Sequence, residues 1–240
     1  SLKVEKSGLV GNLSGAAVEF FAVLRPFAPD HIVYCKYDYL YRGAADPEDA
    51  KMAVEWFELE HGYLPKVIMI KGLGLVSVGD NTAASDIVSE VFGDMLKIAW
   101  MAGAFGGANP MTREQVDFID NWEVENYRRK VGAPSSAGRM ENKTVVITGA
   151  AQGFGAGRDS GVRGHGANIV VADLNEALGS ETAASLNVPA KCNKAIFVKT
   201  DVSDTSSLAN LVHMAVCAFG GIDVFVSNAG ILRAGNIGDM

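Results

Sequence analysis

The feature that most constrains this chain is a glycine-rich turn placed directly after an apolar strand. The apolar run VVIT ends a strand predicted over 143–148, and Gly149, Gly153 and Gly155 follow it ahead of a helix start. Glycines in this context permit a tight turn, a close approach of the backbone to a ligand and close packing of the helix on the strand. Free amides of the turn and the positive end of the helix dipole then attract an anion. The pattern predicts a phosphate-binding turn.

The rest of the C-terminal part alternates between strands and helices. Such alternation predicts a parallel sheet with covering helices, so the expected fold class is α/β with a partial, Rossmann-like sheet. In the helix predicted at 205–219, His213 falls off the apolar face and Cys217 beside its edge, and both are interpreted as surface or packing residues. The predicted strands are 143–148, 168–173, 195–200 and 223–228, and the predicted helices after the glycine turn include 175–186 and 205–219.

A carboxylate at the end of the second strand indicates which nucleotide is bound. Asp173 ends the apolar run IVVAD, where an acidic side chain accepts hydrogen bonds from the adenosine ribose and repels a 2′-phosphate. No Arg or Lys follows it closely, which favours NAD over NADP. The alternative is that Asp173 merely helps to cap the next helix.

Four motifs in order resemble the short-chain dehydrogenase/reductase family. The glycine motif T-G-x-x-x-G-x-G is similar to 148–155, the acidic strand end to Asp173, the adenine-contacting D-V to 201–202, and N-A-G to 228–230. The resemblance covers roughly 140–240, about the first half of a family domain, and implies an NAD-dependent oxidoreductase acting on an alcohol or aldehyde. The cofactor-binding residues that it implies are Gly149, Gln152, Gly153, Phe154, Gly155, Asp173, Leu174, Asp201, Val202, Asn228, Ala229 and Gly230.

Two features depart from that family. Its members activate a tyrosine with a lysine in Y-x-x-x-K, supported by a serine, but the last tyrosine here is Tyr127, so no catalytic residue is assigned. The helix after the glycine turn, 156–165, carries Arg158, Asp159 and Arg163 where relatives have apolar residues. It also holds three glycines, each costing about 1 kcal/mol relative to alanine. We expect a weakened helix there, with Val162 as its anchor to the core.

The first 130 residues predict a mixed α and β domain, joined to 143–240 by a linker at 131–142 that is rich in Gly, Ser, Ala and Pro. The expected elements are a strand over 31–43, a helix over 46–62, a hairpin within 65–81, a helix that includes 84–96, and a helix after the capping box at 112–115. Trp56, Trp100 and Trp122 are predicted to be core residues.

The order of the hairpin, the apolar helix and the segment 116–130 ahead of a dehydrogenase start resembles the later part of a class II aldolase/adducin domain. Bifunctional fusions of the rhamnulose-phosphate aldolase/lactaldehyde dehydrogenase kind have this order, which implies a role in deoxysugar breakdown. Such aldolases hold zinc with histidines. Here Leu73 stands at an expected ligand position, and no metal site is predicted. Two interpretations of Lys71 are left open: it contacts a sugar phosphate, or it is a solvated charge. The four scattered histidines without ligand spacing are His31, His61, His165 and His213.

Composition limits the kinds of molecule that the protein is expected to bind. A net charge of -7 without clustered Lys or Arg argues against nucleic acid, and no run of about 18 apolar residues indicates a membrane span. Three cysteines without CxxC spacing are typical of a reducing cytoplasm. We expect a cytoplasmic homo-oligomer with a small-molecule substrate. The alternatives left open are a non-catalytic nucleotide-binding or scaffold module and a sugar-phosphate aldolase.

Overall fold

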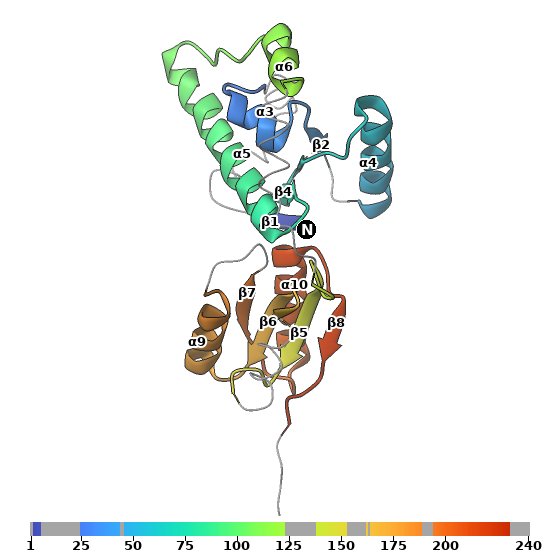
Figure 1. Ribbon diagram of the computed structural model, residues 1–240, viewed down its shortest axis with the longest axis vertical. Coiled ribbons are helices and arrows are strands. Elements are labelled where there is room, and N and C mark those ends of the chain that lie inside the picture. Colours follow the sequence, from blue (N-terminus) through green and yellow to red (C-terminus); the bar gives the residue numbers. More distant parts are fainter. Residues whose placement is uncertain are drawn as a thin grey trace, which may run out of the picture. The chain divides into compact units, whose positions relative to one another are not determined.

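The computed structural model describes residues 2–5, 25–43, 46–122, 138–152, 162, 164–188 and 194–230. The chain divides into two compact units, an N-terminal unit of residues 1–136 and a C-terminal unit of residues 137–240 (Figure 1). Each unit has its own sheet and is described by itself.

The N-terminal unit is built on a four-stranded sheet in the order β1-β4-β3-β2. The central hairpin joins β3 (Val67–Ile70) to β4 (Gly74–Val78), and both Gly72 and Gly74 adopt positive φ in the turn. This confirms the hairpin predicted within 65–81. On the two flanks, β1 (Leu2–Glu5) pairs antiparallel with β4, and β2 (Leu40–Arg42) pairs parallel with β3.

The long helix α5 (Thr82–Ala102) supplies most of the core of this unit. Asn81 caps its first turn by accepting from the Ala84 amide, and Val88, Phe92, Met95 and Leu96 are buried against β3 and β4, which confirms the helix predicted to include 84–96. The described part of this unit has three more α-helices: α3 (Pro29–Cys35), α4 (Pro47–His61) and α6 (Arg113–Asp120). A short 3-10 turn, η1 (Gly103–Phe105), follows α5. The helix predicted over 46–62 and the capping box at 112–115 are confirmed.

The strand predicted over 31–43 is wrong for most of its length. Residues 29–35 form helix α3, with Pro29 at its start, and only 40–42 form a strand. The reason is tertiary: Cys35 packs into the core around α5, and Ile32 packs against Val116 and Ile119 of α6. Burial of both side chains outweighs the preference of β-branched and aromatic residues for strands, because such propensities are weak and set by context.

The prediction that the three tryptophans are core residues is also wrong. Trp56, Trp100 and Trp122 are 72%, 59% and 43% exposed. On α4 only Phe57 is buried, so its neighbour Trp56 points outward. Helical spacing identified the helices but did not identify which face meets the sheet.

The C-terminal unit has a fully parallel sheet in the order β7-β6-β5-β8. Its strands are β5 (Thr144–Thr148), β6 (Asn168–Asp173), β7 (Ala195–Lys199) and β8 (Val224–Val226). The described helices are α9 (Glu176–Leu186) and α10 (Thr205–Phe219). The predicted α/β fold with a parallel sheet is therefore confirmed.

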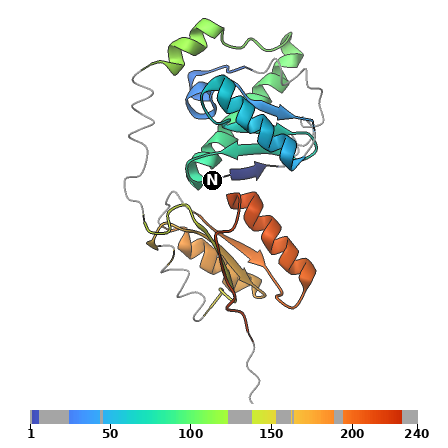
Figure 2. The same cartoon turned by 90° about the vertical axis from the view of Figure 1, so that its right-hand side faces the viewer.

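The two helices cover opposite faces of that sheet (Figure 2). Val145 and Ile169 pack on the side of α9, whereas Val146 and Val170 pack on the side of α10. Alternate residues of each strand are thus buried on both faces, which explains why β5 and β6 read as continuous apolar runs. The buried face of α10 is narrower than predicted, since its Val212 and Val216 are exposed. Among the described helices, none is long and apolar enough to cross a membrane.

Candidate functional site

The order of the strands fixes where a ligand meets the C-terminal unit. The chain runs outward from β5 to β6 and β7, then returns to place β8 on the other side of β5. At such a reversal the loops leaving the two central strands diverge, and ligands bind in the crevice beyond their carboxyl ends. Here those loops begin at Gly149, after β5, and at residue 227, after β8.

The first loop requires glycine at its first position. Gly149 has φ +65°, and its amide donates to the Ala172 carbonyl at 2.8 Å. A Cβ on Gly149 would lie 2.9 Å from the Cα of Ala229, which follows β8. The glycine turn and the N-A-G segment are therefore in contact, and a side chain at Gly149 would force them apart.

Asn228 locks the two loops together. Its side-chain amide donates to the carbonyl oxygens of Thr148, at 3.1 Å, and Gly149, at 3.2 Å. The Thr148 hydroxyl accepts from the backbone amides of Asn228, at 3.0 Å, and Ala229, at 3.1 Å. Backbone groups of each loop are thus held by a side chain of the other motif, which fixes the two loops against each other.

The carboxylate of Asp173 faces the glycine turn. Its Oδ2 accepts from the Ala151 amide at 3.0 Å, and its Oδ1 accepts from the Asn175 amide at 2.9 Å. An ionised carboxylate has about four acceptor positions, so two remain for other donors. Asn175 is the N-cap of α9 and accepts from the Leu178 amide at 3.1 Å. Asp173 therefore contacts both the glycine turn and the cap residue at the start of α9.

The remaining predicted residues follow the ends of β6 and β7. Leu174 and Val202 are 61% and 45% exposed, so two apolar side chains are open to solvent at the carboxyl edge. The Asp201 carboxylate accepts from the amide and hydroxyl of Ser203, at 2.8 Å and 2.6 Å, and these hydrogen bonds lower its pKa. Because the strands are parallel, all these positions share one edge of the sheet.

The structure therefore brings most of the predicted site to one edge and leaves a part undescribed. Gly149, Asp173, Leu174, 201–202 and 228–230 all follow carboxyl ends of parallel strands, and the exposed Gln152 lies in the glycine turn. Gly153, Phe154 and Gly155 lie outside the described residues, as does most of the predicted weakened helix 156–165. Val162 was predicted to anchor that helix to the core, and it is partly buried against the core on the side of α9.

Sequence reasoning missed one residue that holds the turn. The Thr182 hydroxyl, on α9, donates to the Ala151 carbonyl at 3.0 Å. Thr182 lies inside a helix and belongs to no motif, so no local pattern marks it. Its contact is visible only once α9 is packed beside the turn.

The turn between β3 and β4 holds the two residues that the aldolase resemblance singled out, Leu73 and Lys71. No group of three or more His, Cys, Asp or Glu side chains able to hold a metal occurs among the described residues. Leu73 lies in the turn between β3 and β4, and its amide donates to the Ile70 carbonyl at 3.1 Å. Lys71 in the same turn is exposed, and its amide donates to the Arg42 carbonyl at 2.9 Å.

Comparison with known proteins shows what the C-terminal unit is similar to. Residues 143–240 match the sequence model of the short chain dehydrogenase family. This part of the chain is therefore similar to the short-chain dehydrogenase/reductase family, whose members bind NAD or NADP, and the relatives that it matches are oxidoreductases.

Two dehydrogenases illustrate the similarity. Trans-4-hydroxycyclohexanecarboxylate dehydrogenase of Sinomonas cyclohexanicum is 41% identical over 105 residues, which are 42% of this chain and 40% of that protein. The 2,5-dichloro-2,5-cyclohexadiene-1,4-diol dehydrogenase of Sphingobium indicum is 36% identical over 99 residues, which are 41% and 39% of the two chains. A crystal structure of a hydroxysteroid dehydrogenase from Escherichia coli is 27% identical with a TM-score of 0.37, over 38% of each chain.

A third relative extends beyond the C-terminal unit. The oxidoreductase YuxG of Bacillus subtilis is 28% identical over 167 residues, which are 70% of this chain and 24% of that protein. The aligned stretch is longer than the C-terminal unit, so the similarity continues into the N-terminal unit. The aligned parts of these three relatives make up only 24% to 40% of their lengths. None of the three matches supports an aldolase domain in residues 1–130.

Proposed function

We propose that the C-terminal unit is the nucleotide-binding part of an NAD-dependent oxidoreductase of the short-chain dehydrogenase type, which interconverts an alcohol and a carbonyl compound. The observation that carries the proposal is the hydrogen bond from the Ala151 amide to Asp173. It places a carboxylate beside the glycine turn, where the sugar next to a bound diphosphate would lie.

The residues present fit a dinucleotide. Gly149, with φ +65°, lets the turn lie against the segment after β8, and in a glycine turn of this kind backbone amides meet a diphosphate. Asp173 offers its free acceptor positions to ribose hydroxyls, and the exposed side chains of Leu174 and Val202 offer apolar surface to the flat adenine. Bound NAD would supply the chemistry of hydride transfer. The protein's part is to fix the nucleotide, with Asn228 holding the loop on the far side of the crevice.

The charge of Asp173 supports NAD rather than NADP. A 2′-phosphate placed at the ribose would bring negative charge against this carboxylate, and like charges at short range repel. An arginine or lysine beside the ribose would be needed to offset that repulsion. Neither residue type directly follows Asp173 in the sequence, where the next two residues are Leu174 and Asn175.

Titration of the whole chain with NADH and NADPH, followed by nucleotide fluorescence, tests this proposal. We expect NADH to bind at least tenfold more tightly than NADPH, a difference of about 1.4 kcal/mol. Asp173→Ser should weaken NADH binding about tenfold and narrow the preference. The control is Asp223→Asn at the amino edge of the sheet, where Asp223 accepts from the Thr144 amide at 2.8 Å. Equal NADH affinity in Asp173→Ser and the parent would remove Asp173 from the site.

The substrate class is proposed from two sources. The two dehydrogenases described above are named for ring alcohols, which supports an alcohol or aldehyde substrate. The order of elements in residues 1–130, which resembles an aldolase domain in the sequence, supports a place in deoxysugar breakdown. NADH formation by the intact protein with cyclic alcohols and with lactaldehyde separates the two, since oxidation of lactaldehyde alone supports the deoxysugar role.

The alternative is a non-catalytic nucleotide-binding module, which nucleotide binding without turnover by the intact protein would favour. An aldolase function would require a metal, and stoichiometric zinc by elemental analysis would favour it. We also propose that the protein is cytoplasmic, in keeping with the buried free thiol of Cys35. We further propose that it is a homo-oligomer. Analytical ultracentrifugation measures the oligomeric state.

A further inference from the structure

The N-terminal unit contains a cavity of about 520 Å³ that none of the sequence motifs marks. Four segments line it: 25–26, 37–40, the end of α4, and 111–116. The cavity lies at the amino end of β2. The turn that carries Lys71 follows the carboxyl end of β3, which is parallel to β2, so the cavity and this turn are at opposite ends of these strands. Its volume is in the range of roughly 300 to 1,000 Å³ that pockets for small molecules occupy.

Polar contacts between distant segments hold the walls of the cavity in place. The Lys36 ammonium pairs with the Asp120 carboxylate at 2.6 Å, which ties the end of α3 to the end of α6. At the start of α6, the Met111 amide donates to the Pro26 carbonyl at 2.8 Å. Because both ends of the α6 wall are attached, the cavity is preformed.

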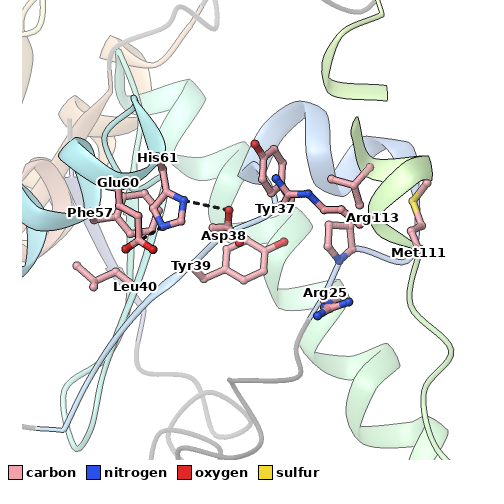
Figure 3. A pocket seen from close by; sticks show the side chains of 12 residues that line it. Arg25, Tyr37, Asp38, Tyr39, Leu40, Phe57, Glu60, His61, Met111 and Arg113 are labelled. Atoms are coloured by element: carbon pink, nitrogen blue, oxygen red, sulfur yellow. Dashed lines mark ion pairs between the residues drawn. The ribbon is translucent and has the colours of Figure 1, made fainter. Parts of the chain in front are cut away.

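Two guanidinium groups lie on one side of the cavity, at the right in Figure 3. Arg113 stacks over the ring of Tyr37 at 4.7 Å, and its Nε pairs with Asp117 at 3.0 Å, which leaves its two terminal nitrogens as donors. Within the described ranges, Arg25 forms no ion pair. Stacking and a carboxylate partner fix the Arg113 fork, and such a fork binds planar anions through two parallel hydrogen bonds.

The opposite side of the cavity carries a fixed imidazole. His61 Nδ1 lies 3.1 Å from Asp38 Oδ2, drawn as a dashed line in Figure 3, and His61 Nε2 lies 3.8 Å from Glu60 Oε2. The imidazole also packs against the Phe57 ring with centroids 4.2 Å apart. This end of the cavity therefore presents hydrogen-bonding groups that favour a hydroxyl.

Between these two sides the lining is aromatic and apolar. The rings of Tyr37 and Tyr39 form this middle section, and the side chain of Leu40 lies on the side of His61. Burial and the nearby Asp120 carboxylate raise the pKa of the Tyr37 phenol, so it remains a neutral hydroxyl at physiological pH. A flat ring fits such a lining better than an extended polar chain, because aromatic faces stack and exclude water.

We propose that this cavity binds a small aromatic acid that carries a hydroxyl group opposite its anionic group. The anion pairs with Arg25 and Arg113, the ring lies against Tyr37 and Tyr39, and the hydroxyl meets the Asp38 and His61 pair. The anionic group is a carboxylate or a phosphate monoester, since both accept two hydrogen bonds from a guanidinium. This site lies in the N-terminal unit and is independent of the proposed nucleotide site.

Binding of 4-hydroxybenzoate to the whole chain, measured by calorimetry at neutral pH, tests the proposal. Removal of the charge, with 4-hydroxybenzyl alcohol as the probe, should weaken binding at least tenfold, and removal of the hydroxyl, with benzoate, should weaken it several-fold. Comparison with 4-hydroxyphenyl phosphate shows which anion is preferred. If 4-hydroxybenzoate and 4-hydroxyphenyl phosphate both fail to bind at millimolar concentration, the proposal is wrong.

Substitutions in the cavity test which residues bind 4-hydroxybenzoate. Arg25→Gln and Arg113→Gln should each weaken 4-hydroxybenzoate binding about tenfold. His61→Gln should make the affinities for 4-hydroxybenzoate and benzoate equal. The control is Lys97→Gln, which removes an exposed charge paired with Asp94 on α5. Circular dichroism and NADH affinity, both expected to be unchanged, show that each variant is folded. Affinities equal to that of Lys97→Gln in both arginine variants would overturn the assignment.

Discussion

In the C-terminal unit the described residues of the candidate site follow the ends of strands, whereas the cavity of the N-terminal unit gathers side chains from four separate segments. The first site is built largely from backbone: the turn at Gly149, the amide of Ala151 and the loop at Asn228. The second is built from side chains, with Arg113 and His61 on different helices. The two sites should therefore respond differently to substitution.

A site made of backbone depends on conformation. Gly149 and Asn228 contribute because of the space and hydrogen bonds they give the chain, so changing either should affect stability and ligand binding together. A site made of exposed side chains depends on charge. Arg113 is 62% exposed, so changing it should affect binding with little loss of stability. The predictions below test this difference.

The largest effect is expected from Gly149→Ala. The added Cβ would meet the Ala229 Cα at 2.9 Å in a residue with φ +65°. Left-handed strain and overpacking together should lower the free energy of unfolding by roughly 2 to 5 kcal/mol. Urea denaturation followed by circular dichroism measures this, and NADH binding should be lost in parallel. Gly221→Ala is the control, because a Cβ there meets nothing within 4 Å. An equal effect of the two substitutions would contradict the close contact between the loops.

A smaller loss is expected from Asn228→Ala. The carbonyl oxygens of Thr148 and Gly149 would lose the side-chain amide that now donates to them. Leaving part-buried acceptors without a donor costs about 1 to 3 kcal/mol. Asn228→Asp keeps the size but turns an acceptor toward two carbonyls, so it should be at least as damaging. Both are compared by urea denaturation with Asn210→Ala, which changes an exposed asparagine on α10. Stability equal to that of Asn210→Ala would mean that Asn228 does not hold the loops.

Local sequence signals predicted most of the C-terminal unit. The predicted bounds of β6 and α10 agree with the structure, and β5, β7 and α9 differ by one residue at an end. Such accuracy follows from the kind of signal, because continuous apolar runs, a glycine after β5 and the apolar spacing of α10 are all local features. The site at this edge was predictable for the same reason, since parallel strands bring the residues after them together.

The parts that the sequence did not predict depend on distant contacts. The helix α3 forms where a strand was expected, because Cys35 packs on α5 and Ile32 on α6. The cavity joins Asp38 to His61 and Lys36 to Asp120 across intervening strands and helices. Thr182 reaches the glycine turn from a helix. No spacing within a window of the sequence encodes such contacts, so pattern reasoning had no signal for them.

The capping box of α6 tests whether the cavity wall depends on local structure. The Thr112 hydroxyl accepts from the Gln115 amide at 3.3 Å, and the Gln115 side chain accepts from the Thr112 amide at 2.9 Å. Thr112→Ala should cost about 1 kcal/mol, and Thr112→Ser should restore most of it. All three tryptophans are in the N-terminal unit, so urea denaturation followed by tryptophan fluorescence reports on this unit. Equal stability of the alanine and serine variants would contradict the cap.

The smallest effect on the free energy of unfolding is expected when acid protonates His31. This buried imidazole accepts from the Phe27 amide at 3.1 Å through Nδ1, a bond that requires a neutral nitrogen. Burial lowers the pKa of His31 below 6.5, although the charges of Asp30 and Asp94 oppose the shift. The unfolded chain therefore takes up a proton at a higher pH than the folded chain does. Stability from this group is fully present above pH 6.5 and is lost as the pH falls below it.

The free energy of unfolding of the N-terminal unit, followed by tryptophan fluorescence, should accordingly decrease between pH 7 and pH 5, the range around the ordinary pKa of histidine. His31→Gln removes the titrating group and should flatten that decrease, whatever its effect on stability at pH 7. The C-terminal unit, followed by hydrogen exchange of the β5 and β6 amides, supplies the contrast, because its pH dependence should be the same in the parent and the variant. A decrease that persists unchanged in His31→Gln would show that His31 does not couple protonation to the packing of α3.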